Sequence, residues 1–229
     1  MKKTDELFKK ADALYDEINS SKINCVDPAS ISHIAKTPYK ILCLREALLW
    51  RSEEISRNCI SLLRSGDIVT AAVLSRCLTE NSAVCWYAME LILDRNSGKR
   101  INDFDEFSMR LLMGHKTWEE MPDPVNIMTQ IDKADKTVSG LRANYDRLSE
   151  LTHPNYMGTS FMFSQIDRNK ILTNFSRYPR NKNKFVKSVL ASHNGSLAML
   201  KHSYNRITDY LPKLISICEE EIRVENEGK

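Results

Sequence analysis

The segment from residue 68 to residue 93 limits most strongly what this chain can fold into. Its residues are apolar on nearly every side of the helix that their spacing predicts, and a helix of that kind is buried on all sides. Its longest apolar stretch, residues 83–93, contains Glu90 and is too short to span a bilayer. The sequence therefore predicts a central helix that other helices cover.

Helical spacing of apolar residues continues through most of the chain, which contains only 7 glycines and 7 prolines. Amphipathic helices are predicted over residues 4–19, 38–64, 104–115, 124–136, 139–153 and 182–222. Pro212 is expected to kink or split the last of these helices. The predicted fold class is all-α, a helical bundle.

The breaks between the helices predict the domain organisation. Residues 1–37 are expected to form an N-terminal helix and a loop, and residues 38–226 a single helical bundle domain. Within that domain, Ser65-Gly66-Asp67 is expected to turn the chain between two long helices, with Asp67 as the N-cap of the second.

Composition narrows the class of protein. A net charge of +3 permits nucleic-acid binding without arguing for it. The 6 cysteines include no C-x-x-C pair and none has a histidine at zinc-ligand spacing, so we expect reduced thiols, no metal and no cofactor. The N-terminal sequence MKKTDELFKK is charged and lacks an apolar signal core. We therefore expect a cytoplasmic protein that is not associated with a membrane.

Two residues with suitable chemistry for a phosphate group, Arg147 and His153, lie in the stretch YDRLSELTHPNY. Pro154 disfavours helical backbone at the residue before it, so His153 should end the helix with extended backbone. Six helical steps turn about 240°, so the two side chains share a face only if this break swings the imidazole back toward the guanidinium. A permanently charged arginine beside a histidine that titrates near neutral pH is suited to phosphate chemistry.

A charged pair, Arg76 and Glu80, interrupts the apolar central helix. The spacing of four residues places both side chains on one face, and charges in apolar surroundings need partners. The pair is interpreted as a buried ion pair that adds specificity rather than stability. The functional interpretation, which the first does not exclude, is that it orients Arg147 or His153.

An arginine followed by five residues and a histidine, at the end of a late helix in a small helical protein, resembles the HEPN superfamily. The residues LSELTHPN, 148–155, are similar to a motif of bacterial HEPN-related proteins, which also carry an Arg-x-x-x-Glu helix, matched here by Arg76 and Glu80. The resemblance covers about residues 40–155. HEPN proteins are helical bundles, usually dimeric, and many are metal-independent endoribonucleases of toxin–antitoxin and phage-defence systems.

This resemblance implies RNA as the substrate and a homodimer in which two copies of Arg147 and His153 form one catalytic site. His153 would act as general acid or base, and Arg147 would stabilise the charge on phosphorus. An antitoxin or another defence protein is the implied partner. The residues expected to support the site are Arg76, Glu80, Glu150, Asn155 and Tyr156.

A purely structural role is the alternative. Arg147 would pair with Glu80 or Glu150 and tie two helices together, and His153 would cap the C-terminus of its helix, where a cation is favoured. The protein would then be a non-catalytic helical scaffold or a nucleotide- or RNA-binding module.

The segment after this motif is expected to differ from the rest of the chain. Residues 161–163 and 171–175 flank the turn-like sequence at 167–169, which predicts a short β-hairpin. The basic, aromatic stretch 168–187 suits either a solvated loop or the binding of single-stranded RNA through phosphate contacts and ring stacking. The candidate RNA-binding residues are Arg168, Lys170, Arg177, Tyr178, Arg180 and Lys182.

Overall fold

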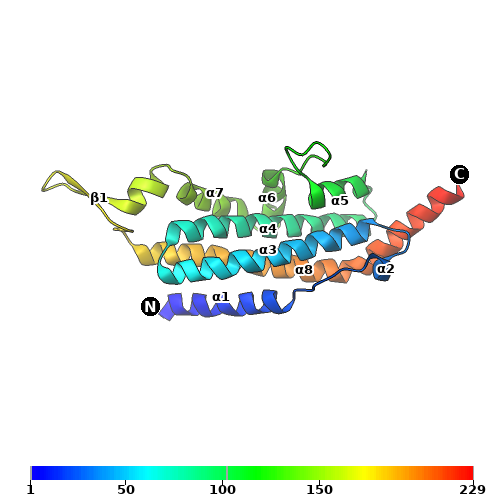
Figure 1. Ribbon diagram of the computed structural model, residues 1–229, viewed down its shortest axis with the longest axis horizontal. Helices are drawn as coiled ribbons and strands as arrows, with labels where there is room; N and C mark the ends of the chain where they lie inside the picture. Colours follow the sequence, from blue (N-terminus) through cyan, green and yellow to red (C-terminus); the bar gives the residue numbers. More distant parts are fainter. Residues whose placement is uncertain (1, 102, 229) are drawn as a thin grey trace.

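The computed structural model describes residues 2–101 and 103–228 and is a bundle of helices with one projecting hairpin (Figure 1). In chain order the helices before the motif segment are α1 (Lys2–Ser20), α2 (Pro28–Ile31), α3 (Thr37–Ser65), α4 (Ile68–Asn96), α5 (Phe104–Met113) and α6 (Ile127–Asp135). The remaining elements are α7 (Leu141–Thr152), the π-helix η1 (Met157–Phe161), β1 (Ser164–Asp167), β2 (Leu172–Phe175) and α8 (Lys182–Glu227). The predicted all-α bundle with a short hairpin is confirmed.

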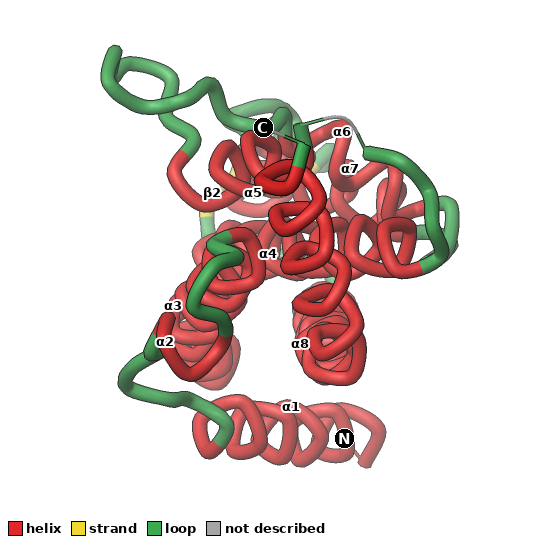
Figure 2. Tube along the Cα trace, turned by 90° about the vertical axis from the view of Figure 1, so that its right-hand side faces the viewer, coloured by secondary structure: helices red, strands yellow, loops and turns green. Residues whose placement is uncertain are grey.

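Helix α4 is the centre of the bundle, as its apolar sequence predicts. It packs against α3, α6, α7 and α8, and Figure 2 shows these helices around it in the view along the bundle. Ala71, Ala72 and Ala83 are fully buried, together with the larger Leu78 and Ile92. Small side chains bring the neighbouring helices close, and the larger ones fill the space between them.

The turn between α3 and α4 forms where the sequence predicts it. Gly66 follows α3 with a φ of 84°, in the left-handed region that glycine adopts without a steric penalty. Asp67 occupies the N-cap position of α4, but its side chain makes no capping hydrogen bond. The hydroxyl of Tyr178 accepts the Ile68 N–H at 2.9 Å instead. The N-terminus of the central helix is therefore capped by a residue 110 positions away.

Helix α1 is part of the packed bundle and lies along α3 and α8, with Ala11 and Ile18 buried. A polar contact adds to this packing. The carboxylate of Glu53 on α3 accepts hydrogen bonds from three side chains: Tyr15 at 2.9 Å, Lys22 at 3.1 Å and Arg57 at 3.3 Å. Burial alone would raise the pKa of Glu53, but the three donors outweigh burial and hold its pKa below the ordinary value.

Helix α8 is continuous over 46 residues, so the expectation that Pro212 splits it is wrong. Proline removes one helical hydrogen bond and crowds the preceding turn. The helix nevertheless continues because Leu214 and Cys218, beyond the proline, are buried against the bundle. It also extends past the predicted end at residue 222 to Glu227, and its last turns project beyond the other helices (Figure 1).

The predicted hairpin is present and extends from the opposite end of the molecule (Figure 1). Its first strand is residues 164–167, so the expectation that residues 161–163 form that strand is wrong; these residues are helical. Its strands are antiparallel, with Ser164 opposite Phe175 and Asp167 opposite Leu172. The Asp167 carboxylate accepts the backbone N–H groups of Asn169 and Lys170, which shapes the turn. The hairpin contacts η1 through β1, and its strands are largely exposed.

Candidate functional site

Helix α7 carries the predicted catalytic motif on the surface of the bundle. Gly140 precedes the helix with a φ of 89°, and Leu141, Tyr145 and Leu148 are buried beneath it. The helix ends at Thr152, and His153 has extended backbone, with a φ of −80° and a ψ of 149°. This end confirms the effect expected of Pro154 on the residue before it.

Arg147 is exposed, and its hydrogen-bond partners among the described residues are uncharged. Its guanidinium donates to the Asn144 side-chain oxygen at 2.6 Å and to the Ser192 hydroxyl of α8 at 3.0 Å. Ser192 donates in turn to Asn144, so the three side chains form one connected group. The ion pair expected with Glu80 or Glu150 is not formed within the described residues. The positive charge of Arg147 is therefore fixed in position without being neutralised.

His153 is exposed at the end of α7. Its backbone N–H donates to the Ser149 carbonyl at 3.0 Å and closes the last turn of the helix. Its imidazole makes no hydrogen bond to any residue that the structure describes, and none joins it to Arg147. Within one chain the break at Pro154 thus leaves the two predicted catalytic groups unconnected.

Arg76 and Glu80 do not support this pair directly. Arg76 donates to the Tyr145 hydroxyl at 2.6 Å, and that hydroxyl donates to Glu80 at 3.0 Å. Tyr145 and Arg147 lie on different flanks of α7, because two helical steps separate them by about 200°. The idea that Arg76 and Glu80 orient Arg147 or His153 by direct contact is therefore wrong. They form an ion pair of 3.4 Å that ties α4 to α7 through Tyr145.

Electrostatics strengthens this tie between the helices. Burial disfavours the charge on Arg76, but its hydrogen bond to Tyr145 and the nearby Glu80 raise its pKa above the ordinary value. Burial also raises the pKa of Tyr145, so its hydroxyl keeps its proton and can donate to Glu80. Arg76 therefore keeps its charge, and Tyr145 stays neutral, at neutral pH.

The three other residues expected to support the site shape the loop after His153. Asn155 donates to the Glu150 carboxylate at 2.7 Å and accepts the Gly158 N–H at 3.0 Å. Tyr156 is exposed and its ring meets the edge of Phe161 at 5.9 Å between centroids. The chain here turns back so tightly that a Cβ on Gly158 would lie 2.1 Å from the His153 carbonyl oxygen.

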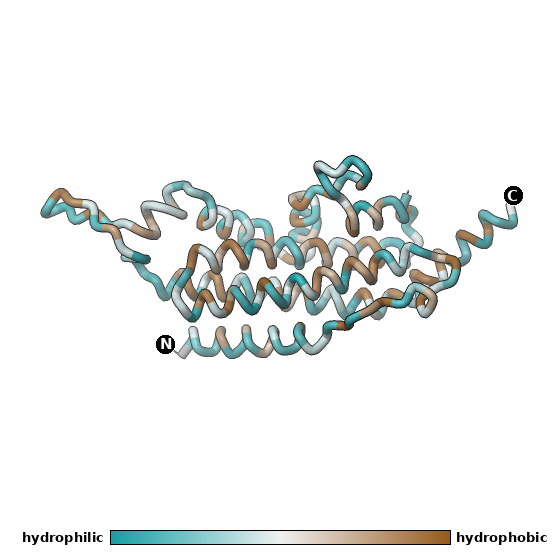
Figure 3. The backbone as a smooth tube through the Cα atoms, in the orientation of Figure 1, coloured by the Kyte–Doolittle hydropathy of each residue, from teal (hydrophilic) through white to brown (hydrophobic). Residues whose placement is uncertain are grey.

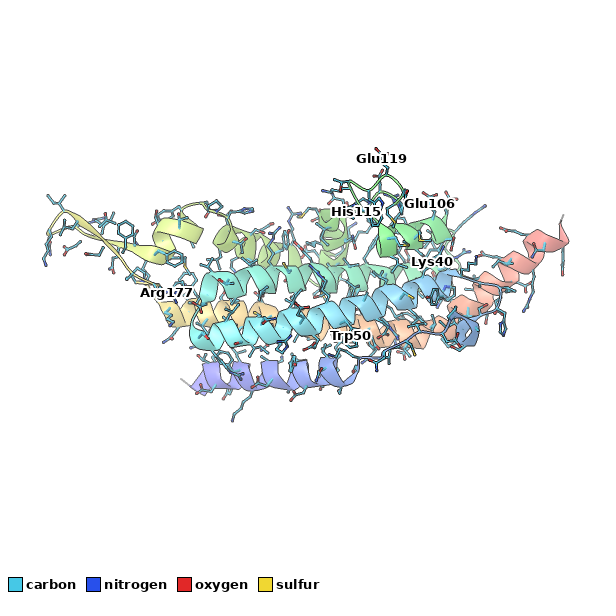
Figure 4. All side chains as sticks on the ribbon, in the orientation of Figure 1. Lys40, Trp50, Glu106, His115, Glu119 and Arg177 are labelled. Carbon is cyan, nitrogen blue, oxygen red and sulfur yellow. The ribbon has the colours of Figure 1, made fainter. Side chains whose placement is uncertain are left out.

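Half of the predicted RNA-binding residues hold the base of the hairpin. Arg177 pairs with Asp67 at 2.9 Å, at the junction of hairpin and bundle where Figure 4 labels it. Tyr178 caps α4, and Arg180 donates to the carbonyls of Phe161 and Ser164 at 2.5 and 2.7 Å. These side chains have structural partners. The other three predicted RNA-binding residues, Arg168, Lys170 and Lys182, are exposed.

The sequence did not indicate Asn144 and Ser192, the two partners of Arg147. Asn144 lies three positions before Arg147, a spacing that brings side chains together on a helix, so it could have been found. Ser192 lies 45 positions further along the chain and carries no local signal. Only the packing of α7 beside α8 identifies it.

The described residues contain no group of three or more histidine, cysteine, aspartate and glutamate side chains placed to hold a metal ion. All six cysteines lie in the described part of the chain and are free thiols. None of the helices within residues 2–101 and 103–228 has the length and apolar character needed to cross a bilayer. The chain matches no protein-family model, no curated protein and no solved structure.

Proposed function

We propose that this protein is a metal-independent endoribonuclease that acts through Arg147 and His153. One observation carries the proposal: α7 has an exposed guanidinium in its middle and an exposed imidazole directly after its last residue, and among the described residues the first has no carboxylate partner and the second no hydrogen bond. A surface arginine that served only stability would gain from an acidic partner. Here the charge stays available for a phosphate group, which guanidinium binds through two parallel hydrogen bonds.

RNA supplies its own nucleophile for this reaction. The ribose 2′-hydroxyl attacks the adjacent phosphorus, the bond from phosphorus to the 5′-oxygen breaks, and a 2′,3′-cyclic phosphate and a 5′-hydroxyl result. His153 would take the proton from the 2′-hydroxyl, or give one to the leaving oxygen. Arg147 would stabilise the negative charge that builds on the phosphoryl oxygens in the transition state.

Because no hydrogen bond joins these two groups within one chain, the proposed site is completed by a second copy of the protein. A two-fold axis beside the end of α7 would place Arg147 of one copy near His153 of the other. The role we propose, in bacterial stress or phage defence and with an antitoxin or defence partner, follows from the resemblance to HEPN proteins.

One observation favours a different function, that of a non-catalytic helical scaffold or nucleotide-binding module. The bond from Arg147 to Ser192 joins α7 to α8, so the arginine also contributes to the packing of the bundle. In this alternative His153 has no chemical role. The two functions differ in what loss of the imidazole should do.

Cleavage of a mixed RNA pool in EDTA tests the proposal. The variants are His153→Ala, Arg147→Lys and the control His33→Ala, which removes another exposed histidine. We expect the wild type and the control to release fragments ending in 2′,3′-cyclic phosphate, and the two motif variants to lose at least about 100-fold in rate. Unchanged helical circular dichroism and melting would show that the variants fold. An inactive wild type, or an active His153→Ala, would rule out this mechanism.

A further inference from the structure

The hairpin carries apolar side chains that the described part of the bundle leaves exposed. Ile166 is 65% exposed, Ile171 90%, Leu172 54% and Phe175 80%, and we call these four residues the apolar knob. Figure 3 shows hydrophobic residues at the far end of the projecting hairpin. By the strand register, Ile166 and Phe175 share one face of the hairpin, Leu172 lies on the other face and Ile171 lies in the turn. A two-stranded hairpin is marginally stable alone in water, and exposed apolar surface marks a contact site. We therefore expect the knob to contact a binding partner.

The backbone conformation of Ile171 also indicates a binding role for the hairpin. Its φ is 50°, in the left-handed region that a β-branched residue rarely adopts. Glycine or asparagine would relieve this strain, and the isoleucine gains nothing from burial because its side chain is almost wholly exposed. A strained and exposed isoleucine at a hairpin tip indicates that its side chain is used in binding.

The charge around the knob is positive. From residue 164 to residue 184 the chain carries six lysines and arginines against one aspartate. Arg168 and Lys170 lie within the hairpin turn, and neither forms an ion pair with a described residue. The knob therefore presents apolar surface with unneutralised cations beside it.

The opposite end of the molecule has the complementary character. The last turns of α8 and the segment before α3 border a groove of about 950 Å³, which we call the tail groove. Its lining includes the apolar Ile34, Ile222 and Val224. Five carboxylates, among them Glu220 and Glu225, outnumber the three cations of the lining, Lys36, Arg95 and Arg100. From residue 213 to residue 228 the chain has five glutamates against two lysines and arginines.

We propose that the apolar knob of one copy docks into the tail groove of the next copy, so that the chains associate head to tail. The two surfaces lie at opposite ends of the long axis, so a knob cannot reach the groove of its own chain (Figure 1). The opposite charges favour the encounter, and the apolar side chains of both surfaces leave water when they meet. Such a contact uses different surfaces on the two copies and so generates rings or open chains.

A second copy fits the knob better than a nucleic acid or a lipid surface does. Three of its four apolar side chains are aliphatic and offer no ring on which a base could stack. A lipid surface would explain the apolar tip and the cations but not the acidic, apolar groove on the same chain. A small contact of this type gives weak association that depends on protein concentration and falls with salt.

Sedimentation velocity over a concentration series tests the proposal with three double variants. The knob variant, Ile171→Asn with Phe175→Thr, removes exposed apolar surface and relaxes the backbone at residue 171. The tail variant is Glu220→Lys with Glu225→Lys, which reverses two of the charges that line the groove. The control, Glu119→Lys with Glu120→Lys, makes the same charge change in an exposed loop elsewhere (Figure 4).

We expect the mean mass of the wild type and of the control to rise with protein concentration. The mean mass of the knob variant alone, and of the tail variant alone, should stay constant at all concentrations. A mixture of knob and tail variants should associate again, because each still carries the surface that the other has lost. A wild type without this rise, variants that still associate, or a mixture that does not associate would each overturn the proposal.

Head-to-tail association does not depend on the proposed ribonuclease activity. A two-fold dimer formed at α7 would be the smallest species of both variants. RNA cleavage by the tail variant would remain at the wild-type level, because Glu220 and Glu225 lie outside the proposed site. Loss of cleavage in His153→Ala, without a change in sedimentation, would concern the catalytic proposal alone.

Discussion

Tyr178 was predicted to bind RNA, but its hydroxyl accepts the N–H of Ile68 at 2.9 Å and lies 3.5 Å from that of Val69. Tyr178→Phe would remove this acceptor and leave the ring packed on Phe163, whose centroid is 5.5 Å away. Ile68 is fully buried, so water cannot easily replace the lost acceptor. An unpaired buried N–H typically costs about 1–3 kcal/mol, and we expect the free energy of unfolding to fall by that amount.

Urea unfolding followed by circular dichroism measures this loss, which should appear as a lower midpoint with an unchanged slope. For a chain of this size each kcal/mol lowers the melting temperature by about 2–4 °C. Tyr156→Phe is the matched control, because Tyr156 is exposed and its hydroxyl makes no hydrogen bond to a described residue. If both variants unfold within about 0.5 kcal/mol of the wild type, Tyr178 does not stabilise the start of α4.

Two further predictions concern glycine and acid. Gly158→Ala should lower the melting temperature, because its Cβ would lie 2.1 Å from the His153 carbonyl oxygen. Gly195→Ala, which has open space around it, should raise the free energy of unfolding by up to about 1 kcal/mol. Equal melting temperatures of the two variants would contradict this prediction. The folded-state pKa of Glu53 is lowered, so its contribution to stability is present above about pH 4.5 and is lost as the pH falls through that pKa. Urea midpoints should therefore show a stability difference between wild type and Glu53→Gln at pH 7 that shrinks as the pH is lowered below 4.5. A difference that stays constant would exclude the linkage.

The sequence predicted the elements of the fold well because local signals determine them. The apolar residues of α4 indicated its central place, Gly66 indicated the turn after α3, and Pro154 indicated the end of α7. Each of these effects acts within a few residues of its cause. The prediction that Pro212 splits α8 is wrong because the burial of residues beyond the proline outweighs its local penalty.

The partners of the charged side chains could not be predicted in the same way. Arg76 and Glu80 were correctly expected to share a helix face, but the sequence did not show that Tyr145 lies between them. The N-cap of α4 was assigned to Asp67 from its position, whereas the distant Tyr178 provides the capping atom. Each choice depends on how two helices are rotated about their axes, and residue spacing along one helix does not fix that rotation.

The rotation of α7 about its axis places Tyr145 and Arg147 in different electrostatic surroundings. The helix buries Leu148 and turns Tyr145 toward α4, where Arg76 and Glu80 neutralise each other across its hydroxyl. Arg147, two steps beyond Tyr145, falls on the flank beside α8, where its only described partners are neutral. If cation placement served stability alone, both flanks should offer carboxylates. Among the described residues only the first does, and this supports the proposal that Arg147 binds an anion. Its substitution by lysine is then expected to lower RNA cleavage more than the free energy of unfolding.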